Sequence, residues 1–416
     1  MISWPTPFIP SVPGTGRPVE LFDTATGQVR ALTPGPVARM YVCGITPYDA
    51  THMGHAATNV TFDVLGRALR DAGHDVEYVQ NITDVDDPLL ERAQRDGVAW
   101  EDLATQEIAL FREDMTALAV IPPDHYVGVV ESVPAIGDVV RRLLEQGAAY
   151  AVSTPESSAG DDVYLDIRSD KGFGSVSNWD RDQMLEVFPE RGGDPDREGK
   201  RDALDPLLWR AARDGEPSWS VEGLPDGRPG WHVECTAIAL DHLGMAFDVQ
   251  GGGTDLIFPH HEMSASQAVV VTDERPFARF YAHQAMVGLD GEKMSKSRGN
   301  LVLVSKLRAD GVDPMAIRLA LLDQHYRTEW SWSDELLERA EARLARWRSA
   351  LSVNTAPPAD EVVETVRERV ASDLDTPGAL AAVDRWAEQT LTRGGDDASA
   401  PGVLARALDA ILGVRV

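Results

Sequence analysis

The string His-Met-Gly-His at residues 52–55 places two imidazoles where a phosphate could bind. It follows a short apolar segment and begins a stretch with helical spacing of apolar residues, Met53 to Ala72. The free N–H groups in the first turn of a helix favour an anion, and His52 and His55 could donate to a triphosphate as charge builds on it. Two surface histidines at a turn are the alternative interpretation.

A second string, KMSKS at residues 293–297, holds two of the few lysines of the chain. The sequence has 39 basic residues, of which five are lysines, and Lys293 and Lys296 lie between Gly291 and Gly299. A loop between glycines could close both ammonium groups over a departing pyrophosphate and neutralise charge that develops only in the transition state. A solvated basic loop is the alternative.

The scarce sulfur ligands suggest a metal site. Cys43 and Cys235 are the two cysteines of the chain, and with His260 they would suit Zn²⁺ and leave one tetrahedral position open for a substrate. Separations this long carry no local signature, so two buried thiols and a core histidine are the alternative. We expect His261 and Glu262 to orient His260 and not to bind the metal themselves.

The segments that would position these groups indicate an α/β fold. The turn within VELFDTATGQVRAL, residues 19–32, predicts a hairpin. The apolar runs ARMYVCG at 38–44 and DVEYVQNIT at 75–83 predict strands on either side of the helix at 53–72. Strand, helix and strand within about 45 residues indicate a βαβ unit and a parallel, nucleotide-binding type of sheet.

The rest of the chain divides by its pattern. Residues 88–150 show helical spacing, whereas residues 151–230 are rich in Gly, Asp, Ser and Pro. Strand-like segments at 247–256 and 281–291 are expected to resume the sheet. Ser333 precedes an acidic turn and helical spacing, which predicts a helix capped by that serine and, with the segments after it, a small helical bundle.

Length, composition and charge limit the class of protein. A chain of 416 residues exceeds the usual single core, and its net charge of −28 disfavours a broad electrostatic grip on nucleic acid. No apolar run reaches membrane-spanning length, no signal pattern starts the chain, and two distant cysteines suit a reducing compartment. We therefore expect a cytoplasmic protein without nucleic-acid or membrane partners, and a monomer because no long apolar helix face demands a partner.

Together, in this order and about 240 residues apart, the two strings resemble the HIGH and KMSKS signatures of class I aminoacyl-tRNA synthetases. Met53 replaces the Ile of the first signature, and residues 293–297 match the second without change. The resemblance implies a Rossmann-type core that forms an aminoacyl adenylate from ATP. We expect a synthetase-like α/β catalytic domain at residues 1–325, with an insertion or excursion at about 120–230, and a C-terminal helical bundle at 326–416.

Further blocks resemble those of cysteinyl-tRNA synthetases, among them YVCGITPYDATHMGHA, NITDVDD, GWHVECTAIA and GGGTDLIFPHHE. In that family zinc binds the substrate thiolate, which implies one Zn²⁺ per chain on Cys43, Cys235 and His260. Serine would be rejected because its hydroxyl is a poor zinc ligand. Those enzymes usually add a Glu ligand where this chain has Ser264, and they continue into an anticodon-recognising region beyond the point where this sequence ends.

All these features, with ERGGDP at 190–195 and HHEMS at 260–264, resemble a paralogous family, the cysteine:glucosaminyl-inositol ligases of mycothiol biosynthesis. The resemblance implies that L-cysteine and ATP, with Mg²⁺, give cysteinyl-AMP and pyrophosphate. The amine of glucosaminyl-inositol would then take the cysteinyl group and release AMP. The sequence does not identify the base that deprotonates this amine.

The same resemblance assigns site residues one by one. The phosphates would be stabilised by His52, His55, Lys293 and Lys296. The adenylate would lie against Cys43, Gly44, Ile45, Thr46, Thr58, Asn81, Ile82, Thr83, Trp231, Gly253, Thr254, Asp255 and Val287. Glycines before Asp255 would let the backbone approach the nucleotide while its carboxylate accepts from ribose hydroxyls, although a turn Asp after flexible glycines is the alternative.

Several charged and aromatic residues near these blocks admit two interpretations. Trp231 could offer a flat face to the substrate or pack in the core. Asp84, Asp86 and Asp87 could touch the substrate ammonium, but we expect them to cap a helix. In ERGGDP, the residues that could grip a sugar or inositol, or merely form a structural turn, are Glu190, Arg191 and Asp194.

Two other functions compete with the ligase. A compact cysteinyl-tRNA synthetase would need a basic face to bind tRNA. The strongly negative net charge of the chain disfavours such a face. A non-catalytic adenylate- or zinc-binding regulator should have lost signature residues, whereas His52, His55, Lys293 and Lys296 are all present.

Overall fold

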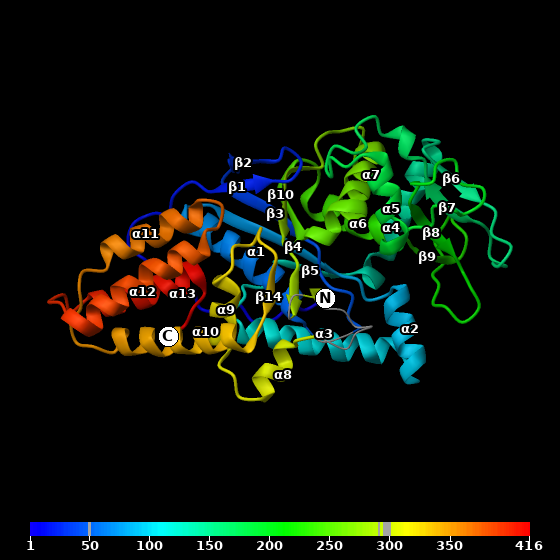
Figure 1. The fold of residues 1–416 in the computed structure, drawn as a ribbon. Helices are drawn as coiled ribbons and strands as arrows, with labels where there is room; N and C mark the ends of the chain where they lie inside the picture. The colour runs from blue at the N-terminus through cyan, green and yellow to red at the C-terminus, as the bar shows by residue number, and fades with distance from the viewer. Residues whose placement is uncertain (49–50, 290–291, 294–300) are drawn as a thin grey trace.

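A central parallel sheet lies between a C-terminal group of helices and an insertion with its own sheet (Figure 1). The structure, a computed structural model, describes residues 1–48, 51–289, 292–293 and 301–416. Figure 1 places the C-terminal helices and the insertion at opposite ends of the molecule, with the central sheet between them.

The central sheet has five strands, all parallel, in the order β11-β10-β3-β4-β5. Their bounds are Val37–Val42 (β3), Asp75–Ile82 (β4), His125–Gly128 (β5), Phe247–Gly253 (β10) and Ala278–Gln284 (β11). The chain proceeds outward from β3 to β5 on one side and from β10 to β11 on the other. Such a reversal leaves a crevice at the carboxyl ends of β3 and β10, where Rossmann-type folds bind nucleotides. The predicted parallel sheet is confirmed.

The predicted βαβ unit is also present. Helix α1 (Met53–Asp71) connects β3 to β4 and buries one apolar face, as its spacing indicated. The predicted hairpin consists of β1 (Glu20–Asp23) and β2 (Gln28–Ala31), which pair antiparallel. The loop between β3 and α1 therefore starts at the switch point of the sheet.

Strand β5 corrects the prediction of helical structure over residues 88–150. Helices α2 (Asp87–Asp96) and α3 (Trp100–Ala117) occupy the first part, but β5 then pairs with β4, and α4 (Val129–Glu145) follows without a loop. The four residues of β5 are too few to show a two-residue period, which explains why the sequence pattern did not reveal the strand.

The insertion holds a four-stranded antiparallel sheet in the order β6-β7-β8-β9. Its elements are Ala149–Val152 (β6), Asp162–Leu165 (β7), Ile167–Ser169 (η1), Arg181–Val187 (α5), Pro189–Arg191 (η2), Leu207–Ala211 (β8) and Gly227–Pro229 (β9). Because β5 belongs to the parallel sheet, the antiparallel part starts after α4. We propose the division of the chain into residues 1–325, with an insertion or excursion at about 120–230, and residues 326–416.

After β9 the chain returns to the central sheet. Its next elements are Trp231–Leu243 (α6), β10, Thr254–Leu256 (η3), Ile257–His261 (η4), Glu262–Thr272 (α7) and β11. A small second sheet follows, made of Val287–Leu289 (β12), Glu292–Lys293 (β13) and Trp330–Trp332 (β14). These segments bring the glycine run of β10 and the two histidines of η4 back to the switch point.

The C-terminal helices form the predicted bundle. Helices Val304–Ala309 (α8) and Pro314–Leu322 (α9) precede it, and the bundle consists of Asp334–Leu351 (α10), Asp360–Ala371 (α11), Thr376–Arg393 (α12) and Ala400–Leu412 (α13). Ser333 caps α10 as predicted, because its hydroxyl accepts from the N–H of Leu336. No helix within the described ranges is both long and apolar enough to cross a bilayer.

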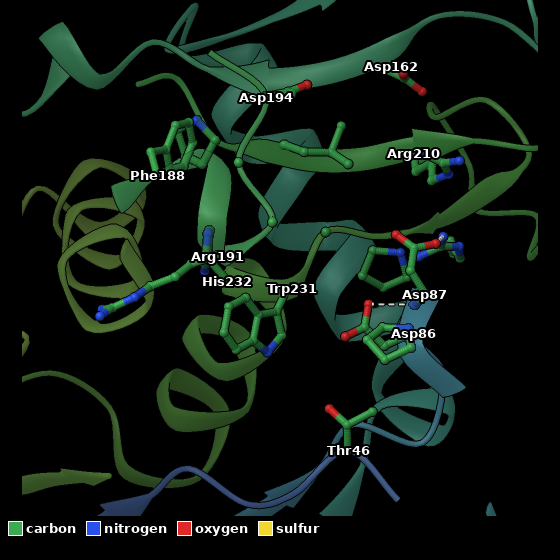
Figure 2. Close-up of a pocket in the computed structure, with 18 of the residues that line it drawn as sticks. Thr46, Asp86, Asp87, Asp162, Phe188, Arg191, Asp194, Arg210, Trp231 and His232 are labelled. Carbon is green, nitrogen blue, oxygen red and sulfur yellow. Dashed lines mark hydrogen bonds and ion pairs between the residues drawn. The ribbon is translucent and has the colours of Figure 1, made fainter. Parts of the chain in front are cut away.

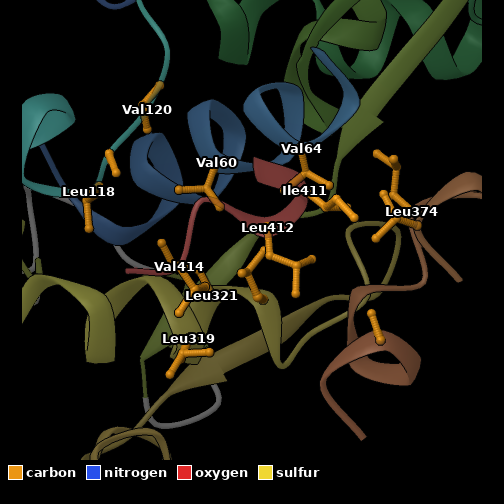
Figure 3. Close-up of a cluster of buried hydrophobic side chains, with 14 of the residues drawn as sticks. Val60, Val64, Leu118, Val120, Leu319, Leu321, Leu374, Ile411, Leu412 and Val414 are labelled. Carbon is orange, nitrogen blue, oxygen red and sulfur yellow. The ribbon is translucent and has the colours of Figure 1, made fainter. Parts of the chain in front are cut away.

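One hydrophobic core extends from the central sheet into this bundle. Val60 and Val64 of α1 pack in the same cluster as Leu321 of α9 and Ile411 of α13 (Figure 3). The bundle therefore holds in place the helix that carries the His-Met-Gly-His string at its start.

A buried group of charges lies across the same joint. The Asp63 carboxylate of α1 accepts from Arg67 Nε at 2.7 Å and pairs with Arg318 of α9. The two guanidinium groups also donate to carbonyl oxygens of α13, Arg67 to Asp409 and Arg318 to Leu412, both at 2.7 Å. Each buried charge is thus paired and hydrogen-bonded, which removes the main cost of burying it.

Candidate active site and metal centre

Two thiols and an imidazole from three distant segments meet at the switch point. Cys43 follows β3, Cys235 lies on α6 and His260 lies on η4, and their ligand atoms all lie within 4.8 Å of one another. Cys43 Sγ is 3.9 Å from Cys235 Sγ, which is 3.2 Å from His260 Nε2. Two sulfurs on one tetrahedral zinc would be about 3.8 Å apart. The predicted trio is therefore a buried group that fits a single metal ion.

The side chain that supports His260 is His232, which the sequence analysis missed. His232 Nδ1 lies 3.0 Å from His260 Nδ1, and the Trp231 ring lies 4.4 Å from the His260 ring. Both His232 and His260 are buried. His232 is three residues before Cys235 on α6, so the helical spacing that places both on one side was present in the sequence.

The expectation that His261 and Glu262 orient His260 is wrong. The Glu262 carboxylate accepts backbone N–H groups of Gly174, Val176 and Ser177 at 2.7, 3.0 and 2.7 Å, so it anchors the insertion. These three hydrogen bonds from backbone N–H groups hold the buried Glu262 carboxylate in the insertion and not at the metal trio.

His261 instead supports the other side of the trio. Its Nε2 lies 3.3 Å from Cys43 Sγ, and its Nδ1 lies 2.8 Å from His283 Nε2. His283 Nδ1 in turn lies 2.7 Å from the Thr24 hydroxyl. Burial lowers the pKa of His283 to about 3, so this imidazole is neutral at ordinary pH. The imidazole rings of His261 and His283 therefore connect the Cys43 thiol to Thr24 in the hairpin.

Ser264 occupies the position where the related synthetases usually have a Glu ligand. Its buried hydroxyl donates to the His232 carbonyl oxygen at 3.1 Å, which ties α7 to α6. Among the described residues the candidate ligands in this place are thus the two cysteines and His260.

The His-Met-Gly-His string begins α1 as predicted. His52 is the N-cap, and its Nδ1 accepts from the N–H groups of Gly54 at 3.1 Å and His55 at 3.4 Å. The His52 and His55 rings stack with centroids 3.8 Å apart. The Thr58 hydroxyl donates to the Gly54 carbonyl, one turn earlier. Two imidazoles therefore lie together at the positive end of a helix.

The segment after the KMSKS string is bonded to this helix start. Met53 N–H donates to the Val302 carbonyl at 3.0 Å, and Val304 N–H donates to the Thr51 carbonyl at 2.9 Å. Lys293 lies in β13, whereas Lys296 and the rest of KMSKS lie outside the described residues. The segment that begins a few residues after the KMSKS string is thus joined to the start of α1 through backbone hydrogen bonds, although the two are far apart in sequence.

The carboxyl ends of β3 and β4 touch closely. The Asn81 amide oxygen accepts from the Gly44 N–H at 2.9 Å, and Thr83 N–H donates to the Ile45 carbonyl at 3.1 Å. A Cβ on Gly44 would lie 1.7 Å from the Asn81 carbonyl oxygen, so only glycine fits there. The Thr83 hydroxyl donates to the buried Glu234 carboxylate at 3.3 Å. The segments 43–46 and 81–83, expected to hold the adenylate, are therefore side by side.

The remaining expected adenylate residues lie at two other places. Gly253 ends β10 and is followed by Thr254 and Asp255 in η3, beside the cavity described below. Val287 lies in β12 with its side chain buried in the same cluster as α1.

A cavity of about 860 Å³ opens between this site and the insertion (Figure 2). Its lining on the catalytic side includes Thr46, Asp86, Trp231, His232 and Asp255. The opposite wall comes from the insertion and includes Asp162, Phe188, Arg191, Asp194, Leu207 and Arg210. A volume of this size suits a ligand as large as a disaccharide.

The insertion wall is built from charges that are already paired. Asp194 Oδ1 lies 2.9 Å from Lys200 Nζ, and Asp162 lies 2.8 Å from the Arg213 guanidinium. Arg191 donates to the Asp255 carbonyl at 2.6 Å and also to the Phe258 carbonyl. Within ERGGDP, Arg191 and Asp194 therefore have internal partners, and Arg191 holds η3 against the insertion.

The expectation that all three aspartates of the acidic turn after β4 cap a helix is confirmed for two of them and wrong for the third. Asp86 is the N-cap of α2, and Asp84 accepts from the Val130 N–H at 2.9 Å near the start of α4. Asp87 instead forms an ion pair with Arg228 of β9. Asp86 thus combines a capping role with a place on the cavity wall.

The amino-acid sequence matches a family described as "tRNA synthetases class I (C) catalytic domain" over residues 29–342. Among curated proteins, it is 61% identical over 414 residues to the L-cysteine:1D-myo-inositol 2-amino-2-deoxy-alpha-D-glucopyranoside ligase of Streptomyces avermitilis. The ligases of that name from Thermomonospora curvata and Nocardia farcinica are each 59% identical to it. These three alignments cover 100% of both chains.

Solved structures of class I synthetases share the fold. Mycobacterium tuberculosis methionyl-tRNA synthetase in complex with methionyl-adenylate superposes with a TM-score of 0.65 at 18% identity, covering 90% of this chain and 89% of that chain. An Agrobacterium radiobacter LeuRS in a complex with tRNA and LeuAMS gives a TM-score of 0.66 at 13% identity, covering 94% and 85%. The synthetase-like α/β fold is confirmed. The chain belongs to the class I (C) tRNA synthetase catalytic-domain family and, within it, to the L-cysteine:1D-myo-inositol 2-amino-2-deoxy-alpha-D-glucopyranoside ligases.

Proposed function

We propose that this protein activates L-cysteine with ATP as cysteinyl-AMP and joins the cysteinyl group to the amine of glucosaminyl-inositol, a step of mycothiol biosynthesis. The observation that carries the proposal is the buried trio of Cys43, Cys235 and His260 next to a large cavity with many charged side chains in its lining, in a chain 61% identical to such a ligase over its full length. The trio suits a thiol substrate, and the cavity suits a second substrate rich in hydroxyl groups.

Recognition of cysteine depends on the trio. A zinc ion, one per chain, held by Cys43, Cys235 and His260 would bind the substrate thiolate and so distinguish cysteine from serine. The residues fit such an ion because their donor atoms are close, buried and soft, and because His232 and His261 support two of the three.

Activation uses the start of α1 and the KMSKS string. The carboxylate of cysteine attacks the α-phosphorus of ATP, supplied with Mg²⁺, and pyrophosphate leaves. His52 and His55 lie at the positive end of a helix, where they donate to the phosphates. Lys293 and Lys296 complete the group, and the backbone bonds between segments 51–53 and 302–304 support this arrangement.

The adenylate occupies the crevice at the carboxyl ends of β3 and β10. The backbone of segments 43–46 and 81–83 forms one wall, and Asp255 after the glycines of β10 accepts from the ribose hydroxyls. Trp231 lines the cavity with its ring 4.4 Å from that of His260, and it offers this ring to the substrate.

Transfer takes place at the mouth of the cavity. The acceptor amine attacks the activated carbonyl, an amide forms and AMP leaves. The paired charges of the insertion wall present donors and acceptors to the hydroxyl groups of sugar and inositol without a strong net field. We propose that the protein acts as a cytoplasmic monomer without a nucleic-acid partner. The two buried thiols form no disulfide, which agrees with a reducing compartment, and the net charge of −28 disfavours nucleic-acid binding.

Acceptor-dependent release of AMP tests the proposal. The purified protein is incubated with ATP and cysteine, with glucosaminyl-inositol, with deacylated tRNA or with neither, and AMP is quantified by chromatography. We expect fast turnover with glucosaminyl-inositol and only slow release in the other two reactions. Turnover with tRNA and not with the sugar would instead identify a compact cysteinyl-tRNA synthetase.

A further inference from the structure

Asp86 lies on the cavity wall where the two substrates would meet. It lines the cavity together with Thr46, Trp231 and Asp255. Figure 2 shows its carboxylate extending from the start of α2 toward Trp231, on the same side as Thr46. Thr46 and Asp255 flank the proposed adenylate and the insertion wall faces the proposed acceptor, so Asp86 lines the cavity that both substrates would share.

The Asp86 carboxylate has fewer positively charged partners than several other carboxylates of the cavity wall. Within the described part of the chain, its side chain accepts one hydrogen bond, from the Asp87 N–H at 2.8 Å. Asp87 is paired with Arg228, and Asp162 and Asp194 are paired with Arg213 and Lys200. In the described part of the chain, the Asp86 carboxylate forms no ion pair with a nitrogen-to-oxygen distance of 4.0 Å or less. A cation arriving through the cavity would therefore find an acceptor there.

The surroundings of Asp86 also make it basic. Burial raises the pKa of its carboxyl to about 6, and the neighbouring charge of Asp87 acts in the same direction. The groups that face it are Arg228 from β9 and His260 from η4, which lower this pKa, and the buried Glu234 from α6. A carboxylate of this basicity is mostly ionised at pH 7 yet can still take a proton, as a general base should.

We infer that the Asp86 carboxylate is the base that deprotonates the acceptor amine in the second half of the reaction. This inference rests on the proposed function. The ammonium of the glucosamine gives one proton to Asp86, and its freed lone pair forms the C–N bond to the cysteinyl carbonyl. The C–O bond to the phosphate then breaks, and AMP leaves with the electron pair. The second proton lost by nitrogen passes to a phosphate oxygen of the departing AMP.

The variant Asp86→Asn separates basicity from structure. Asn is as good an N-cap as Asp, so α2 should keep its start while the side chain loses its ability to accept a proton. Asp86→Ser, which also caps, is made as a second variant for the case in which the Asn form folds poorly. Asp96→Asn is the matched control, because it removes a carboxylate at the opposite end of α2 that does not line the cavity.

Two assays distinguish the half-reactions. Cysteine-dependent exchange of pyrophosphate into ATP reports adenylate formation alone, and single-turnover transfer from enzyme-bound cysteinyl-AMP to glucosaminyl-inositol reports the second step. For Asp86→Asn we expect exchange within about threefold of wild type, but transfer slowed about 100-fold or more. The wild-type transfer rate should fall at acid pH with an apparent pKa near 6, and the variant should lose that dependence. Asp96→Asn should match wild type in both assays.

Other results would overturn the inference. Transfer by Asp86→Asn at the wild-type rate would show that another group takes the proton. Equal loss of exchange and transfer in a folded variant would show that Asp86 serves cysteine binding. If wild type forms the adenylate but does not transfer it to glucosaminyl-inositol at all, the proposed function fails, and with it this role of Asp86.

Discussion

His232 Nδ1 and His260 Nδ1 lie 3.0 Å apart in the interior of the protein, so one of the two rings must carry a proton on that nitrogen. His260 directs its Nε2 toward Cys235 Sγ, which is 3.2 Å away. A metal on His260 Nε2 requires the proton on its Nδ1, and His232 then accepts it. Burial lowers the pKa of His232 well below its usual value, which keeps that ring neutral and able to accept.

Replacing His232 should therefore weaken metal binding without removing a ligand. For His232→Ala we expect metal affinity to fall about 10- to 100-fold, the usual cost of losing such a supporting hydrogen bond. Competition with a chromogenic chelator measures this affinity. The control is His125→Ala, a histidine of β5 whose side chain is 40% exposed and whose ring lies beside that of His242, outside the trio. Unchanged metal affinity in His232→Ala would show that the Nδ1 contact does not orient His260.

Removing the metal should abolish activation of cysteine. After dialysis against a strong chelator we expect cysteine-dependent pyrophosphate exchange to be lost and to return when Zn²⁺ is added back, because the thiolate would have no ligand. Cys235→Ser should not recover under the same treatment. Exchange at the original rate in protein shown by elemental analysis to be metal-free would contradict the assigned role of the trio.

Gly44 should tolerate no side chain. A Cβ there would lie 1.7 Å from the Asn81 carbonyl oxygen, so Gly44→Ala must separate the ends of β3 and β4. We expect adenylate formation to drop by about 100-fold, since misplacing reactants by an ångström has such an effect. Gly35→Ala, where a Cβ meets nothing within 4 Å, should be neutral. Pyrophosphate exchange compares the two variants, and similar rates would contradict the close contact.

The buried charges at the α1–α9 joint should be costly to disrupt. Asp63→Ala leaves the guanidinium groups of Arg67 and Arg318 without their carboxylate in the core, which should destabilise the protein by about 3 to 5 kcal/mol. Glu145→Ala removes half of an exposed pair with Arg141 and should cost less than about 0.5 kcal/mol. Urea unfolding measures both free energies. A small loss for Asp63→Ala would mean that the buried network contributes little.

His283 predicts a specific dependence of stability on pH. Its pKa is lowered to about 3 in the folded protein by burial, whereas an unfolded histidine has a pKa of about 6.5. As the pH falls below about 6.5 the unfolded state takes up the proton first, so the stability that the neutral ring contributes is lost progressively. The advantage of wild type over His283→Gln should shrink by about 1.4 kcal/mol per pH unit in urea unfolding. A constant difference between pH 7 and 5 would contradict a neutral buried ring.

The elements with strong local patterns were predictable from the sequence. The hairpin, the β3–α1–β4 unit and the Ser333 cap follow from turn residues, apolar spacing and capping chemistry. The trio of Cys43, Cys235 and His260 was also predicted, although by resemblance, because no short-range rule connects residues so far apart.

The parts that were missed depend on contacts between distant segments. Strand β5 is four residues long and takes its conformation from pairing with β4. His283 and Thr24 support the site only because β11 passes beside the hairpin. Glu262 follows two histidines in the sequence, but the three amide groups that hold it come from the insertion. None of these relationships has a local signature.

The chemical identity of the product tests the central claim most directly. Wild-type protein is supplied with ATP, cysteine and glucosaminyl-inositol, and the product is analysed by mass spectrometry before and after treatment with a thiol-specific alkylating reagent. We predict a new species with the summed mass of cysteine and glucosaminyl-inositol less one water, which takes up one alkyl group, formed in equal amount to AMP. If AMP appears without this species, or if cysteine is recovered only as an ester of tRNA, the chain is not the ligase proposed.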